Sequence, residues 1–158
     1  MACLPSCNRC CIHGNITTTD SASGWSEVIV DVRDEVLAAA RELVAAFGSH
    51  DAVRYFACFA DDASFVFHNT NETITSRSRY EEIWRDWERD GFLVLGCHSL
   101  DQRVQLIDPD TAVFTHRVRT RLAGESDEQR ERETIVFRRD PAGAWLAVHE
   151  HLSVDPAE

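Results

Sequence analysis

The sequence predicts an α+β domain in which helices early in the chain pack against one antiparallel sheet formed by the later residues. Apolar residues with helical spacing dominate residues 26–91, whereas alternating strand patterns dominate residues 92–153. Helices followed by a run of strands are typical of α+β architectures. Three tight turns separate the strands, so neighbouring strands are expected to pair as a meander.

Three helices and one short strand are expected before the main sheet. The first helix is expected over residues 26–48, where apolar side chains recur every three or four positions and a glycine ends the pattern. Asp51 is the expected N-cap of a second, short helix, and an aromatic-rich strand follows at residues 64–68. Ser78 and Glu81 form a capping box that predicts the start of the third helix.

The third predicted helix carries an aromatic stripe and ends at Gly91. Its apolar residues have the spacing of one helical face: Tyr80, Ile83, Trp84 and Trp87. A stripe of this kind is typical of a helix that packs against a core.

Four strands are expected in the second half of the chain. Their predicted ranges are 92–107, 112–122, 131–139 and 145–153, with turns at 108–110, 123–127 and 140–143. The first of these strands is expected to bend near Gly96. A strongly curved sheet that wraps around helices creates a concave pocket.

Composition excludes several classes of function. The formal net charge of −11 argues against binding to nucleic acid or to anionic membranes. No apolar run approaches the roughly 20 residues that span a bilayer. The chain contains no lysine, which excludes a Schiff-base lysine and a phosphate-loop lysine. No secretory signal is recognised, so we expect a cytoplasmic protein with free thiols.

Four cysteines crowd the first eleven residues: Cys3, Cys7, Cys10 and Cys11. With His13 they could supply zinc ligands, although only one Cys-x-x-Cys spacing is present. We expect a flexible, cysteine-rich leader over residues 1–24 and one domain over residues 25–158. Adventitious metal binding and a functional zinc site stay open as alternatives for the leader.

The closing strand resembles that of a known family. Residues 145–153 contain the pattern Trp-x-x-Val-His-x-His-x-Ser, and residues 59–63 read Phe-Ala-Asp-Asp-Ala. Both resemble SnoaL-like (YybH-type) domains of the nuclear-transport-factor-2-like, or ketosteroid-isomerase-like, superfamily. The resemblance covers residues 27 to 153. It implies a cone-shaped, curved antiparallel sheet wrapped around N-terminal helices, with a small-molecule pocket that Tyr80 and Trp84 border.

The same resemblance selects one face of the sheet as the pocket lining. Side chains alternate between faces along a strand. The association domain of the calcium/calmodulin-dependent kinase, a superfamily member with a similar closing strand, implies that Arg117, Glu133 and Glu150 share the pocket with Ile135 and Leu152. A β-bulge would reverse this assignment.

The resulting hypothesis gives each ionisable residue a catalytic role. Burial would raise the pKa of Glu150 and suit it to move protons. Arg117 would hold an anion or an oxyanion, and Glu133 would orient Arg117. The alternative is a structural ion pair between Arg117 and Glu150 or Glu133 that braces the sheet.

Resemblance to ketosteroid isomerase supplies a further candidate. The positions of its catalytic aspartate and oxyanion-hole tyrosine correspond here to Phe67 and Arg41, so the same steroid chemistry is not expected. His68 follows Phe67 and could act as a base instead. A structural role for His68 stays open.

A metal site is the alternative use of the histidines. His116, His149 and His151 could bind zinc, copper or iron if their strands brought them together. The closing His-x-His pattern also occurs in superfamily members that need no metal. We therefore expect neither a metal nor another cofactor.

The leading functional hypothesis is a cofactor-free isomerase, cyclase or hydratase that acts on an apolar, carbonyl-bearing small molecule. A non-catalytic metabolite-binding or dimerisation module and a metal-dependent enzyme are the alternatives. A homodimer is expected because one sheet face was inferred to be open and apolar.

Overall fold

The computed structural model describes the backbone of residues 22–156 and the side chains of residues 32–156. The elements are α1 (Ala22–Gly48), α2 (Ala52–Ala57), β1 (Phe59–Phe67), α3 (Arg77–Arg89), β2 (Val94–Asp108), β3 (Thr111–Leu122), β4 (Gln129–Arg139) and β5 (Trp145–Val154). This order confirms the predicted α+β class. The four clustered cysteines and most of the predicted leader lie outside the described residues. No helix in the described part of the chain is long and apolar enough to cross a membrane.

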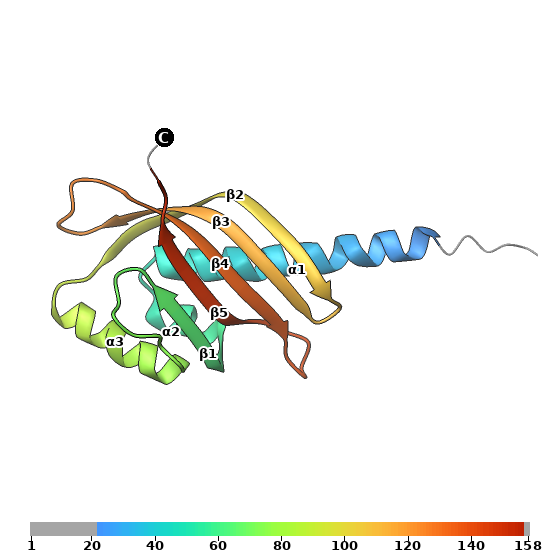
Figure 1. Cartoon of the computed structure of the whole chain (residues 1–158), viewed down its shortest axis with the longest axis horizontal. Coiled ribbons are helices and arrows are strands. Elements are labelled where there is room, and N and C mark those ends of the chain that lie inside the picture. Colours follow the sequence, from blue (N-terminus) through green and yellow to red (C-terminus); the bar gives the residue numbers. More distant parts are fainter. Residues whose placement is uncertain (1–21, 157–158) are drawn as a thin grey trace, which may run out of the picture.

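One five-stranded sheet forms the framework, with strand order β1-β5-β4-β3-β2. Strands β2 to β5 pair antiparallel in sequence order, which confirms the predicted meander. Strand β1 adds to the edge of β5 in parallel. Figure 1 shows the sheet arching over α1, with α2 and α3 at one end of the molecule. The curvature leaves that end open as the mouth of a cone.

Short polar side chains cap the N-termini of α2 and α3. The Oδ1 atom of Asp51 accepts a hydrogen bond from the backbone nitrogen of Arg54 at 3.1 Å, so Asp51 caps α2 as predicted. The predicted capping box at Ser78 is wrong by two residues. Ser76 is the N-cap of α3, because its backbone is extended and its Oγ accepts from the nitrogen of Arg79 at 3.2 Å.

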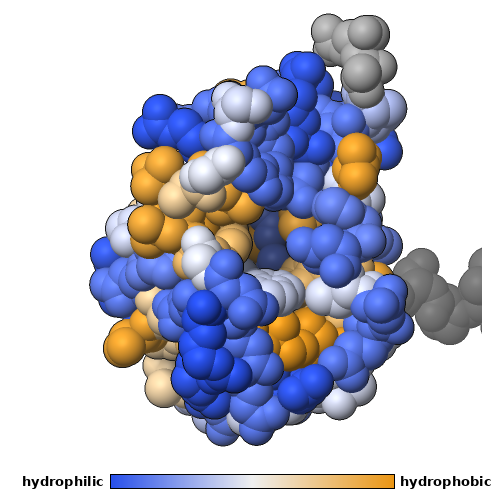
Figure 2. All heavy atoms as spheres, turned by 90° about the vertical axis from the view of Figure 1, so that its left-hand side faces the viewer, coloured by the Kyte–Doolittle hydropathy of each residue, from blue (hydrophilic) through white to orange (hydrophobic). Residues whose placement is uncertain are grey.

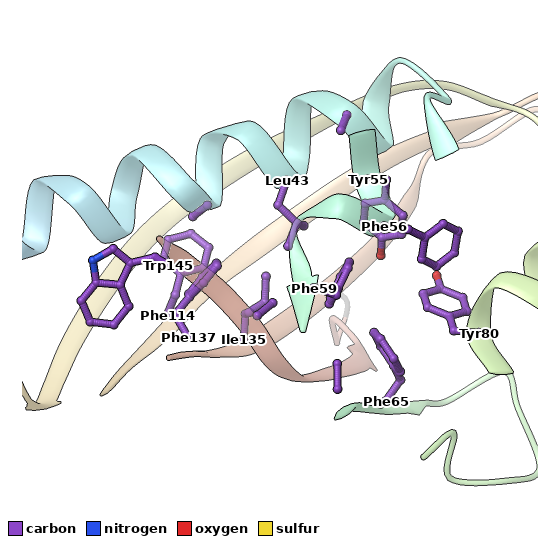
Figure 3. Packing of buried hydrophobic residues seen from close by; sticks show 14 of the residues in the cluster. Leu43, Tyr55, Phe56, Phe59, Phe65, Tyr80, Phe114, Ile135, Phe137 and Trp145 are labelled. Carbon is purple, nitrogen blue, oxygen red and sulfur yellow. The ribbon is translucent and has the colours of Figure 1, made fainter. Parts of the chain in front are cut away.

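The core lies between α1 and the concave face of the sheet. Leu43 points from α1 toward the strands, where the side chains of Phe114, Ile135 and Phe137 gather (Figure 3). Each of these four side chains is at most 2% exposed. Full burial of one such side chain contributes about 1.5–3 kcal/mol to the free energy of unfolding.

A β-bulge in β5 decides which side chains face inward. Val136 pairs with His149, but the next residue of β4, Phe137, pairs with Ala147. Val148 is therefore the extra residue of the bulge. As a result, Trp145 and Ala147 before the bulge and Glu150 after it are all buried.

The outer face of the sheet differs from the apolar surface that the sequence predicted. Alternate residues of β3 and β4 place arginines there, and the strand register sets Arg117 opposite Arg132 and Arg119 opposite Arg130. Like charges in such pairs repel each other. The carboxylate of Asp155 offsets this repulsion, because it lies 2.9 Å from Arg117 and 3.2 Å from Arg119.

Candidate active site

A pocket opens at one end of the cone, between the sheet and the three helices. It has a cavity volume of about 70 Å³ beneath an open mouth. Figure 2 looks into this end of the molecule and shows a central hollow whose deepest visible part is hydrophilic. The lining combines an apolar wall with a small number of polar groups, which is typical of small-molecule sites.

Aromatic side chains supply much of the wall. Those that line the pocket are Phe47, Tyr55, Phe67, Tyr80, Trp87 and Phe92. Within this wall, the ring centroid of Tyr80 lies 5.2 Å from that of Phe67 and 5.9 Å from that of Trp87. These rings come from all three helices, from β1 and from the segment between α3 and β2, so the packing of the whole fold shapes the pocket.

Three glutamates also line the pocket, and each is buried. Glu131 and Glu133 are alternate residues of β4 and therefore share its inner face, whereas Glu150 comes from β5 immediately after the bulge. Their exposed fractions are 6%, 7% and 4%. Glutamates are almost never buried so completely without partners, which makes the cluster a candidate site.

Glu150 is held as a buried acid. The hydroxyl of Tyr55 donates a hydrogen bond to its Oε2 at 3.2 Å. Burial raises the pKa of Glu150 well above the usual value, and the charge of Glu133 and a hydrogen bond with it raise the pKa further. The carboxyl therefore keeps its proton at pH values where exposed glutamates have lost theirs.

Glu133 is supported by a histidine on the neighbouring strand. The strand register places His116 directly opposite Glu133, and the Nε2 of His116 hydrogen bonds to the Oε2 of Glu133. The Oγ of Ser99 lies 2.7 Å from Nδ1 of the same ring, and Gln102 donates to that Oγ at 2.8 Å. Since Gln102 is the donor to Ser99, the serine hydroxyl is free to donate to Nδ1, which leaves a proton on Nε2 for Glu133.

Glu131 has a histidine partner of its own. The Nε2 of His68 lies 2.6 Å from the Oε1 of Glu131. Burial raises the pKa of Glu131, and the hydrogen bond from His68 opposes this effect. His68 itself does not line the pocket and reaches it only through Glu131.

Arg117 does not lie in the pocket, and its predicted placement there is wrong. Strand β3 turns His116 inward, so alternation turns Arg117 outward. Its guanidinium pairs with Asp155 at 2.9 Å and with Asp101 at 3.4 Å. The prediction failed because it placed Arg117 and Glu133 on one face, whereas the regular register of β3 and β4 sets His116 opposite Glu133 and Arg117 opposite Arg132.

The predicted lining residues divide into two groups. Tyr80 and Leu152 line the pocket. Trp84 and Ile135 do not, because they are packed in the core with exposed fractions of 1% and 0%. The indole nitrogen of Trp84 donates to Glu88 at 2.8 Å rather than toward a ligand.

The alternative metal site of His116, His149 and His151 is not assembled. His116 faces inward, whereas His149 faces outward and its Nδ1 lies 2.9 Å from the Oγ of Ser64. His151 is exposed on the same outer side. Among residues 32–156, no group of three histidine, cysteine or acidic side chains is placed to hold a metal ion.

Sequence reasoning missed three residues of the site. Glu131 shares its strand face with Glu133 and could have been found from the two-residue spacing alone. Tyr55 and Ser99 gave no comparable signal. Tyr55 reaches Glu150 because α2 packs against the sheet, and Ser99 reaches His116 because β2 pairs with β3.

Comparisons with known proteins agree with this architecture. The model of the SnoaL-like domain matches residues 36–157. No curated protein matches the chain. A protein of unknown function from Pseudomonas putida KT2440, described as NTF2-like, is 19% identical with a TM-score of 0.68, over 82% of this chain and 89% of that one.

Two further solved structures are similar in fold. A ketosteroid isomerase-like protein from Erwinia carotovora atroseptica is 16% identical with a TM-score of 0.68, over 78% of this chain and 96% of its own. ActVI-ORFA from Streptomyces coelicolor is 17% identical with a TM-score of 0.64, over 79% of this chain and 98% of its own. At these identities the likeness establishes the fold and not a shared reaction.

Proposed function

Because the chain belongs to the SnoaL-like domain family and its pocket holds a buried acid beside a second carboxyl group, we propose that it is a small-molecule enzyme that uses acid/base chemistry. The environment of Glu150 is the main support for this proposal. Its side chain is 4% exposed, accepts a hydrogen bond from Tyr55 and has a raised pKa. A carboxyl group that keeps its proton above the pH range in which exposed glutamates ionise can donate that proton to a bound substrate.

Glu150 and Glu133 divide the two proton transfers between them in this proposal. Glu150 gives its proton to the substrate, and the hydroxyl of Tyr55 stabilises the carboxylate that results. Glu133, fixed by His116, takes a proton from another atom of the substrate. The two carboxyl groups line the same pocket, and the proton then returns from Glu133 to Glu150.

A cycle of this kind leaves the enzyme unchanged and requires no net gain of protons. It fits reactions in which a substrate receives one proton and loses another, such as isomerisation, hydration, its reverse, or cyclisation. The apolar wall suits a substrate with an apolar body. General acid/base catalysis of this type typically accelerates a reaction by about 10²–10⁴-fold.

The test is turnover of a small-molecule mixture in D₂O, followed by mass spectrometry. Proton transfer to carbon adds one deuterium to the product, and hydration or dehydration changes its mass by one water. We expect a compound that the wild-type protein changes and the Glu150→Gln variant does not. Glu82→Gln is the matched control, because Glu82 is exposed on α3 and outside the pocket.

A metabolite-binding module is the second candidate, favoured by one observation. Among the described residues, every fully buried side-chain nitrogen or oxygen has a hydrogen-bond partner, as expected if the glutamates serve only to stabilise the pocket. This function predicts a compound that binds tightly and is recovered unchanged from both wild type and Glu150→Gln. Such a result would exclude the enzymatic proposal for that ligand.

A further inference from the structure

We propose that Glu131 forms a subsite for a positively charged group, so that the ligand of this pocket is an organic cation such as an ammonium compound with an apolar body. This inference deepens the proposed function, because it assigns a substrate class to the same pocket. It concerns recognition of the ligand and leaves the proton transfers to Glu150 and Glu133.

Among the described residues, the pocket lining contains acidic side chains and no basic ones. Glu131, Glu133 and Glu150 line it, and no arginine or histidine of the described residues does. The arginines nearest in sequence, Arg130 and Arg132, flank Glu131 on β4 and alternate to the outer face. An anionic ligand would therefore meet carboxyl groups without a compensating positive charge.

Glu131 has an oxygen available to a ligand. Its side chain is buried and belongs to the pocket lining, and His68 holds its Oε1 from outside. Within the described part of the chain, no hydrogen-bond partner is found for Oε2. Burial raises the pKa of this carboxyl, and a bound cation would lower the pKa again by supplying the opposite charge.

Aromatic rings lie close to this carboxyl. Phe67 immediately precedes His68, the partner of Glu131, and the ring of Phe67 lies 5.2 Å from that of Tyr80. Phe67, Tyr80 and Glu131 all line the same pocket. A carboxylate next to aromatic faces is the environment in which quaternary ammonium groups bind, through ion pairing and cation–π attraction.

The position of Glu131 along β4 gives the ligand a direction. Gln129, Glu131 and Glu133 follow one another on the inner face of β4, from the turn after β3 toward the core residue Ile135. A cationic group held at Glu131 would leave the rest of the ligand next to Glu133 and Glu150. The subsite would thereby place the reacting part of a substrate at the proposed acid and base.

The test compares two probes of the same shape and different charge. Phenyltrimethylammonium and tert-butylbenzene differ only in the charged nitrogen, and benzoate supplies an anionic probe. Binding to the full-length wild-type protein is measured by NMR shift perturbation and by the fluorescence of the tryptophans. We expect the cation to bind at least about tenfold more tightly than its neutral isostere, and benzoate to bind most weakly.

Two variants then test whether Glu131 causes the preference for the cation. Glu131→Gln should remove most of the preference for the cation, whereas Glu82→Gln should keep it. Equal affinity for the two isosteres, stronger binding of benzoate, no binding of the cation, or a preference that survives Glu131→Gln would each overturn the inference. The isostere comparison in the wild type stands even if Glu131→Gln folds poorly. If Glu131 proves not to bind a cation, the proposed acid role of Glu150 is unaffected, because the experiment in D₂O tests it separately.

Discussion

Replacing Glu150 with glutamine should make the protein increasingly stable relative to wild type as the pH rises. The folded-state pKa of Glu150 is raised, because burial, the charge of Glu133 and a hydrogen bond with it all disfavour ionisation. In the unfolded chain the same carboxyl ionises near its ordinary pKa of about 4.3. Below that pH both states are protonated, and the favourable contribution of the neutral acid is fully present.

The sign and size of the effect follow from proton linkage. Above pH of about 4.3 the unfolded state releases the proton and the folded state keeps it, so the free energy of unfolding of the wild type falls as the pH rises. The loss continues until the pH passes the raised folded-state pKa. One proton corresponds to at most about 1.4 kcal/mol per pH unit. Glutamine is a suitable replacement at this position, because it does not titrate and its carbonyl oxygen can still accept a hydrogen bond from Tyr55.

Urea denaturation followed by tryptophan fluorescence at pH 5, 6 and 7 measures this difference. We expect the stability of Glu150→Gln minus that of wild type to increase at each step, by up to the slope given above. The exposed Glu82→Gln control should show a difference that is nearly constant with pH. A constant difference for Glu150→Gln as well would refute the reasoning, since Glu150 would then ionise normally in the folded protein.

Three further experiments have expected outcomes of their own. Tyr55→Phe removes the hydroxyl donor of Glu150 and should lower the free energy of unfolding by about 1–3 kcal/mol in urea titrations. Phe114→Ala empties a fully buried core position and should cost about 3–5 kcal/mol in the same assay. Burial raises the pKa of the thiols of Cys58 to about 11 and Cys97 to about 12, so both should react slowly with iodoacetamide at pH 8 by peptide mapping.

The fold could be predicted because its signals are local. Helical spacing, aspartate and glycine at helix ends and short turns each act within a few residues, and the strands β3 to β5 begin and end within two residues of the predicted limits. The start of α3 was misplaced because Ser76 and Ser78 are both suitable N-caps. Only the extended backbone of Ser76 distinguishes them.

The site was harder to predict because it depends on the pairing of strands. Glu133 and Glu150 were predicted on one face, and both line the pocket. Arg117 was assigned to that face as well, but the register of β3 and β4 sets His116, and not Arg117, opposite Glu133. The bulge at Val148 separately reverses the inner face along β5, so that Trp145 and Ala147 face inward together with Glu150, and no local pattern in the sequence marks it.

The most direct test of the proposed function is the protonation state of Glu150 itself. Carbon-13 NMR of protein labelled at the glutamate carboxyl groups, titrated from pH 3 to pH 9, reports each carboxyl separately, and the Glu150→Gln variant assigns the resonance. We predict one glutamate resonance that titrates at a clearly higher pH than those of the exposed glutamates and disappears in the variant. If the resonance assigned to Glu150 instead titrates between about pH 4 and pH 5, as exposed glutamates do, the proposed acid catalyst does not exist.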